Sequence, residues 1–139
     1  MNKRTISFWA IVGVAGVLLL YGKADAGSKA SQTVNIYGNG LRAMVDLGAV
    51  RNSANTKEYF GCKVTADAGV TTHTISVSCS VQNSAGVQFD CSSTDANIIN
   101  VALSIKGDSF VNLNRDATNN SKCTHIAVEN SSDRQPKAP

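Results

Sequence analysis

The stretch FGCKVTADAGVTTHTISVSCSVQNSAGVQFDC, residues 60–91, decides the fold, because apolar and polar residues alternate through most of it. Alternation with a period of two is typical of a half-buried β-strand, whose successive side chains point to opposite faces. Residues 67–69 and 83–86 interrupt the alternation with glycine-containing turn sequences. The pattern therefore predicts a meander of three antiparallel strands.

The cysteines favour disulfides over a metal site. Cys62, Cys79, Cys91 and Cys123 are separated by 17, 12 and 32 positions, without the C-x2-C pairs of zinc sites or the C-x-x-C of redox motifs. Cys62 and Cys79 share the apolar face of the first two strands, and the midpoint between them falls in the predicted loop, so they should lie opposite each other. Among the three pairings that four cysteines allow, this register favours Cys62–Cys79 and Cys91–Cys123.

A helix is predicted over residues 94–106. The sequence SSTD at 92–95 supplies capping side chains, and Gly107 follows Lys106 where a helix C-terminal cap is expected. Between these signals apolar residues recur at i, i+3, i+4 and i+7, the pattern of one helix face. They are Ile98, Val101, Ala102 and Ile105.

The flanking segments predict further strands. Residues 33–37 alternate, and residues 41–50 fit a strand better than a short helix. Residues 109–115 and 123–129 predict a final hairpin, in which Cys123 faces the less apolar side unless a bulge intervenes or the outer face is covered. We expect an α+β fold: an antiparallel sheet of about five to six strands with a central meander and one packed helix near 94–106. An all-β sandwich is the alternative.

Residues 1–26 have the layout of a signal peptide. Lys3 and Arg4 precede the uncharged run 6–21, and small residues flank a cleavage site after Ala26. An uncleaved anchor is the alternative, although this run is shorter than a typical spanning helix. We expect a secreted or periplasmic protein with a flexible lead-in at 27–32, one disulfide-stabilised domain at 33–130 and a polar tail at 131–139. We expect the protein to contact the membrane only transiently, through the signal peptide.

Charge gives no case for nucleic-acid binding. Residues 1–26 hold three basic residues and one acidic residue, so cleavage lowers the formal net charge from +3 to +1. The remaining basic residues form no cluster with interleaved aromatic residues.

Four short motifs give the chain a resemblance. They are YFGC at 59–62, SSTD at 92–95, GDS at 107–109 and the segment 123–132, which contains CT and VENSS. This layout, over residues 51–137, resembles small exported four-cysteine proteins of proteobacteria. The resemblance implies a Gram-negative source and a location in the periplasm or outside the cell, and it implies no particular activity.

Candidate chemical groups are few. His73 and His125 could act as a general base or a metal ligand, but neither lies in an H-x-x-x-H or H-E-x-x-H pattern. No G-x-S-x-G motif is present, and the acidic residues are scattered. Tyr37 and Tyr59 are the aromatic candidates for a binding surface. We expect no metal and no cofactor.

The leading functional expectation is an exported, non-catalytic binding or structural protein of the cell envelope with a protein or glycan ligand. The first alternative is a small extracytoplasmic hydrolase that uses His73 or His125. The second is a secreted inhibitor or effector that acts on another protein, through an exposed apolar patch or a protruding loop.

Overall fold

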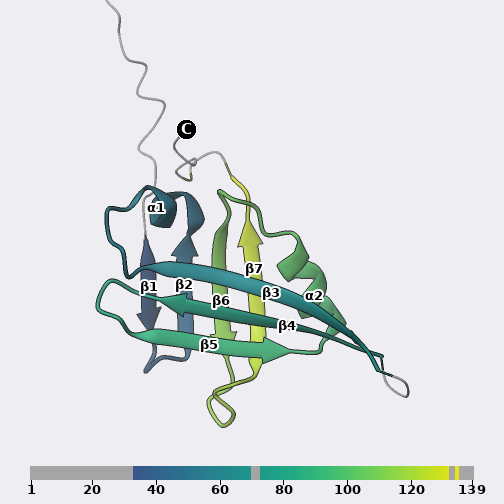
Figure 1. The fold of residues 1–139 in the computed structure, drawn as a ribbon. Helices are drawn as coiled ribbons and strands as arrows, with labels where there is room; N and C mark the ends of the chain where they lie inside the picture. Colours follow the sequence, from purple (N-terminus) through teal and green to yellow (C-terminus); the bar gives the residue numbers. More distant parts are fainter. Residues whose placement is uncertain (1–32, 70–72, 132–133, 135–139) are drawn as a thin grey trace, which may run out of the picture.

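The computed structural model describes residues 33–69, 73–131 and 134. The segments predicted as signal peptide (1–26), lead-in (27–32) and, for the most part, polar tail (131–139) lie outside the described residues. The described chain is mainly antiparallel β structure with two helices, broadly α+β as expected (Figure 1).

The strands form two sheets. The four-stranded sheet has the order β1–β2–β6–β7, and the three-stranded sheet has the order β3–β4–β5. The strands are β1 (Val34–Tyr37), β2 (Arg42–Asp46), β3 (Tyr59–Ala68), β4 (His73–Gln82), β5 (Gln88–Ser93), β6 (Phe110–Arg115) and β7 (Cys123–Glu129). The expectation of a single sheet with five to six strands is therefore wrong, because β2 pairs with β6 rather than with the meander.

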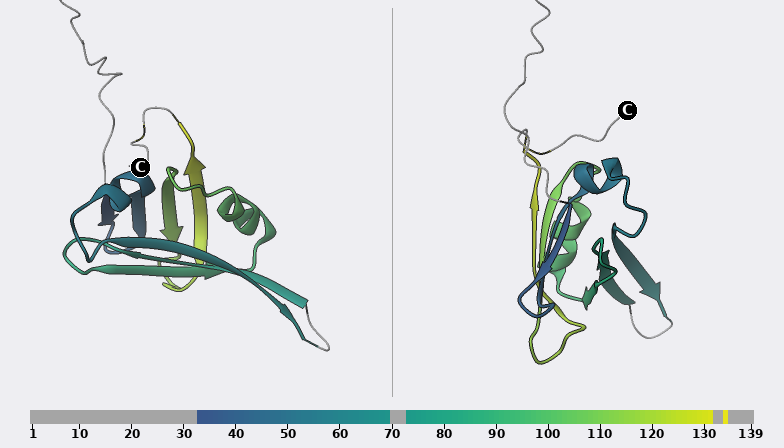
Figure 2. Two further views of the ribbon diagram at one scale, coloured as in Figure 1. Left: turned by 45° about the horizontal axis from the view of Figure 1, so that its top comes forward. Right: turned by 90° about the vertical axis from the view of Figure 1, so that its left-hand side faces the viewer.

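The two sheets face each other, and the strands of one run across those of the other (Figures 1 and 2). Apolar side chains from both sheets fill the space between them. Phe89, Val77 and Val81 come from the three-stranded sheet, and Val45, Val111 and Leu113 come from the four-stranded sheet; all six are fully buried. Burial of such side chains is the main force that holds the sheets together.

Both disulfides join the pairs indicated by the strand register. Cys62 and Cys79 are direct partners across β3 and β4, with Cα atoms 4.1 Å apart. Cys91 on β5 is linked to Cys123 on β7, so this disulfide ties the two sheets together. The register of β6 and β7 shifts at Asn114 and Arg115. Of the two alternatives, a bulge or a covered outer face, the structure therefore has the bulge, which accounts for the buried position of Cys123.

The segment 41–50 corrects the prediction of a single strand. Strand β2 ends at Asp46, and α1 (Leu47–Asn52) follows it directly. The buried Asp46 side chain accepts a hydrogen bond from the backbone N–H of Ala49 at 2.9 Å and so caps α1. Leu47 and Ala49 are buried in the helix, as they would also be in a strand. The alternation of apolar and polar residues therefore does not distinguish a strand from a helix here.

The predicted helix is present but shorter. Helix α2 (Ala96–Leu103) begins after Asp95, whose carboxylate accepts hydrogen bonds from the backbone N–H groups of Asn97 and Ile98. It ends at Ser104 rather than at Gly107. Gly107 has no left-handed backbone; instead its carbonyl accepts a hydrogen bond from Arg51 Nη1 at 3.1 Å. Helix α2 packs mainly against β7.

Candidate functional site

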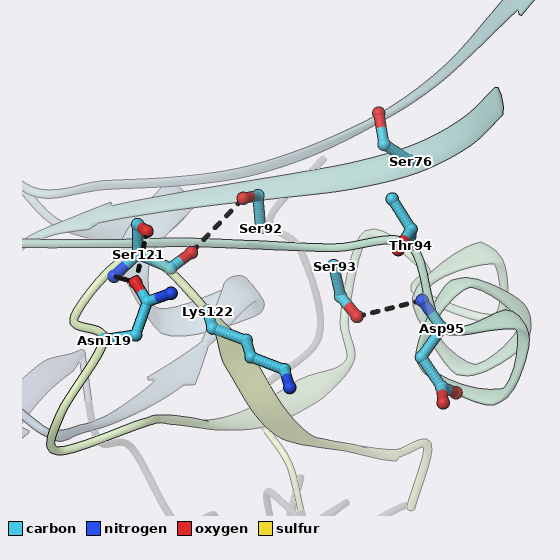
Figure 3. A pocket seen from close by; sticks show the side chains of 8 residues that line it. All are labelled: Ser76, Ser92, Ser93, Thr94, Asp95, Asn119, Ser121 and Lys122. Atoms are coloured by element: carbon cyan, nitrogen blue, oxygen red, sulfur yellow. Dashed lines mark hydrogen bonds between the residues drawn. The ribbon is translucent and has the colours of Figure 1, made fainter.

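A polar hollow of about 480 Å³ lies where the end of β5, the start of α2 and the β6–β7 loop meet. We call it the seam hollow. Figure 3 shows its side chains arriving from β4, from the β5–α2 connection and from the β6–β7 loop. It is lined by Ser76, Ser92, Ser93, Thr94, Asp95, Asn119, Ser121 and Lys122. Hydroxyl and amide groups dominate this lining, so it offers many hydrogen-bond donors and acceptors.

Backbone pairing holds the two sides of the seam hollow together. The Ser92 N–H donates to the Ser121 carbonyl at 2.7 Å, and the Ser92 hydroxyl donates to the same carbonyl at 3.2 Å. The Asn119 side chain in turn accepts from the Ser121 N–H and the Ser121 hydroxyl, at 3.2 and 2.6 Å. The loop is therefore fixed against the end of β5, and the serines are held at defined positions.

Two shallower hollows continue the same concave surface. One, of about 410 Å³, shares Ser93, Asp95 and Lys122 with the seam hollow and extends along α2 to Ile98. The other, of about 320 Å³, shares Thr94 and lies under the β3–β4 hairpin. Its lining is more apolar and includes Ile75, which is 52% exposed. A ligand in the seam hollow thus has an apolar surface within reach on one side.

The charges around the seam hollow are separated. The Lys122 ammonium forms no ion pair with any carboxylate of the described residues. Asp95 is occupied with capping α2. At the base of the β6–β7 loop, the Thr118 hydroxyl holds the pKa of Asp116 below its usual value, and the backbone N–H groups of Thr118 and Asn119 lower it further. Lys122 is left as the group best placed to meet an anionic part of a ligand.

The two histidines lie apart. His73 is exposed at the start of β4 and lines the apolar hollow beside Thr94. His125 is exposed on β7, opposite Asn114. Neither imidazole forms a hydrogen bond with a serine, threonine or carboxylate within 33–69, 73–131 and 134.

The two tyrosines belong to different sheets. Tyr37 is half-buried at the end of β1, and Tyr59 is 40% exposed at the start of β3. Tyr37 does share a surface with His125, because both lie in one cross-strand row of the four-stranded sheet. That row also contains Arg42 and Asn114.

Sequence reasoning did not find the seam hollow as a site. It identified SSTD as a capping cluster and residues 116–122 as a turn, each from local composition. Their contact depends on the pairing of Ser92 with the β6–β7 loop, 29 residues further along the chain. No periodicity of apolar and polar residues predicts a contact between segments this far apart in the chain.

Among the described residues, no three His, Cys, Asp or Glu side chains lie close enough to hold a metal ion. No helix within those residues is long and apolar enough to cross a membrane.

The fold and site define a class: a disulfide-linked, two-sheet β protein with a polar concave surface at the junction of its sheets. Comparison with protein-family models, curated proteins and solved structures gives no match. The resemblance to exported four-cysteine proteins of proteobacteria therefore stays a prediction.

Proposed function

We propose that this chain is an exported, non-catalytic binding protein of the cell envelope and that its ligand occupies the seam hollow. One observation carries the proposal: hydroxyl, amide and ammonium groups from three separate segments converge on a single concave surface. Such convergence of polar groups beside apolar surface is typical of ligand-binding sites.

Export is the second part of the proposal. Two disulfides fit an oxidising compartment, and residues 1–26 have the sequence of a cleavable signal peptide. Mass spectrometry of the protein from its host should give a chain that starts at Gly27 and lacks the four thiol hydrogens. Retention of Met1, or four free thiols, would contradict export.

The seam hollow suits a ligand that carries hydroxyl and amide groups. Soluble peptidoglycan fragments are suitable probes, because they combine sugar hydroxyls with peptide amides and carboxylates. A titration of the ¹⁵N-labelled mature protein should shift the amide signals of residues 92–95 and 119–122 first. Lys122→Gln should weaken binding, because its ammonium is exposed and unpaired.

The matched control is Lys57→Gln. Lys57 is also exposed, and among the described residues only its backbone takes part in hydrogen bonds. An equal loss in both variants would indicate unspecific attraction. Turnover of a probe that disappears in His73→Ala or His125→Ala would instead favour the hydrolase alternative.

A protein partner remains a second candidate because of one observation. The β3–β4 hairpin projects beyond the body of the molecule in Figure 2, and its Ile75 is exposed beside the apolar hollow. This arrangement suits the inhibitor or effector alternative. Ile75→Ser should abolish binding to such a partner, and Lys122→Gln should leave that binding unchanged, because Lys122 does not line the apolar hollow.

A further inference from the structure

The outer face of the four-stranded sheet carries an ordered row of polar side chains. Tyr37 lies opposite Arg42, Arg42 lies opposite Asn114, and Asn114 lies opposite His125. The alternate residues Ala43, Leu113 and Ile126 are buried in the core, so the row points away from it. In the right-hand view of Figure 2, both helices and the three-stranded sheet lie on the other side of this sheet.

A second row lies next to the first on the same face. It contains Asn35, Met44, Asn112 and Ala127, again direct partners across the four strands. The strands are about 4.8 Å apart, so each row extends about 14 Å across the sheet. The two rows together form a strip across the four strands, which we call the outer strip.

Asparagine is an unexpected choice for a β-strand. It is depleted in β-strands, yet the outer strip holds three of them. The side-chain oxygens of Asn112 and Asn114 are buried and have no hydrogen-bond partner in the part of the chain that the structure describes. Unpaired polar atoms of this kind call for an explanation, and local choices that oppose the fold are concentrated at functional sites.

The charge available on this face is positive. Arg42 is exposed and forms no ion pair with a described carboxylate. The two carboxylates on the same side of the sheet are engaged elsewhere: Asp46 caps α1, and Glu129 pairs with Arg134 at 3.0 Å. His125, at the far edge of the row, adds a ring that can donate hydrogen bonds.

From these observations we infer that the outer strip is a second binding surface and that it takes an acidic polysaccharide. The amide NH2 groups of the asparagines can donate to sugar hydroxyls, the Tyr37 ring matches a sugar ring face, and the Arg42 guanidinium matches a sugar carboxylate. A strip about 14 Å long that lies outside the three hollows fits an extended chain better than a small molecule. This surface is distinct from the seam hollow and shares no residue with it.

The test uses polygalacturonate as the probe and its methyl ester as the uncharged control ligand. The mature protein should bind polygalacturonate and should bind the ester much more weakly. Arg42→Gln should lower the affinity for polygalacturonate roughly tenfold, the effect expected for loss of a charge-assisted hydrogen bond. Lys57→Gln, which removes the same charge elsewhere, should leave it unchanged.

The Asn114→Thr variant separates binding from stability, because a purely structural role for Asn114 would not lower the affinity while the melting temperature rises. Threonine is favoured in strands, so the variant should melt at a higher temperature and yet bind polygalacturonate more weakly. Unchanged binding in Asn114→Thr, or equal losses in the arginine and lysine variants, would overturn the inference. If Lys122→Gln abolished polygalacturonate binding, the glycan would belong to the seam hollow, and the outer strip would be excluded while the proposed function stood.

Discussion

Two independent structural constraints favour glycine at position 40. Gly38, Asn39 and Gly40 all have left-handed backbone conformations, with φ values of 62°, 57° and 81°. In addition, a Cβ atom at position 40 would lie 3.0 Å from Arg115 Nη2. Arg115 must stay in place because its guanidinium covers the ring of the buried Phe89, 5.0 Å from the ring centre.

Gly40→Ala should therefore lower the free energy of unfolding by about 1–2 kcal/mol, the cost of a left-handed conformation for a residue with a Cβ. Gly61→Ala is the control, because its Cβ would meet no atom within 4 Å and its φ is not left-handed. Urea denaturation of both variants measures the difference. Equal stability of the two would show that the turn adapts.

Ser109 is a buried polar residue with a structural role. Its hydroxyl accepts a hydrogen bond from the Lys106 N–H at 2.7 Å and donates one to the Asn130 side chain. Ser109→Ala should lower the free energy of unfolding by about 1–3 kcal/mol, because it removes the two hydrogen bonds that this fully buried hydroxyl makes. The exposed Ser78→Ala should change little. A neutral Ser109→Ala in thermal or urea denaturation would contradict this assignment.

At the scale of the element, the β6–β7 loop depends on one carboxylate. Asp116 Oδ1 accepts hydrogen bonds from the Thr118 hydroxyl at 2.6 Å and from the Thr118 N–H at 2.7 Å. These bonds favour the charged carboxylate, so the pKa of Asp116 is lowered in the folded protein. Their stabilising effect is fully present above the unfolded pKa of about 3.9 and is lost as the pH falls through the lower folded value.

Thr118→Ala should raise the pKa of Asp116 towards its ordinary value, because it removes the hydroxyl donor that lowers the pKa most. An NMR titration of the Asp116 carboxyl carbon measures this shift directly. Thr65→Ala, in β3, should leave the Asp116 titration unchanged. If Thr118→Ala had no effect, the backbone donors alone would account for the low pKa.

At the scale of the whole molecule, the two disulfides connect different parts of the fold. Cys62–Cys79 closes a hairpin within one sheet, whereas Cys91–Cys123 joins the two sheets across a longer separation of 32 residues. On loop entropy, loss of the first should cost about 3 kcal/mol and loss of the second about 4 kcal/mol. Denaturation of the Cys62→Ala/Cys79→Ala and Cys91→Ala/Cys123→Ala double variants tests the order. The reverse order would show that sheet packing does not depend on the inter-sheet link.

The cysteine register adds a prediction about pairing. Cys79 lies directly opposite both Cys62 and Cys91. The 4.1 Å separation of the Cys62 and Cys79 Cα atoms is that of a close, non-hydrogen-bonded pair, so Cys79 and Cys91 form the wider, hydrogen-bonded pair. Cys62→Ser should therefore leave a free thiol at Cys79 and an intact Cys91–Cys123, as peptide mapping would show. A Cys79–Cys91 disulfide would contradict this reading.

The sequence by itself determined the features that depend on local periodicity. Alternation over residues 60–91 specified the β3–β4–β5 meander and its register, and the register indicated which cysteines meet. The capping cluster that includes Asp95 placed the start of α2 to within two residues, and the parity of Cys123 indicated either a bulge or a covered outer face. Each of these follows from side-chain direction along one or two neighbouring segments.

Only the tertiary structure decided which distant segments become neighbours. The pairing of β2 with β6 divides the strands into two sheets, and the contact of Ser92 with Ser121 creates the seam hollow. The same sheet order aligns Tyr37 with His125 across two intervening strands. These contacts arise because the apolar faces of the two sheets are buried against each other. This packing joins segments that are distant in the chain, so no local periodicity in the sequence predicts it.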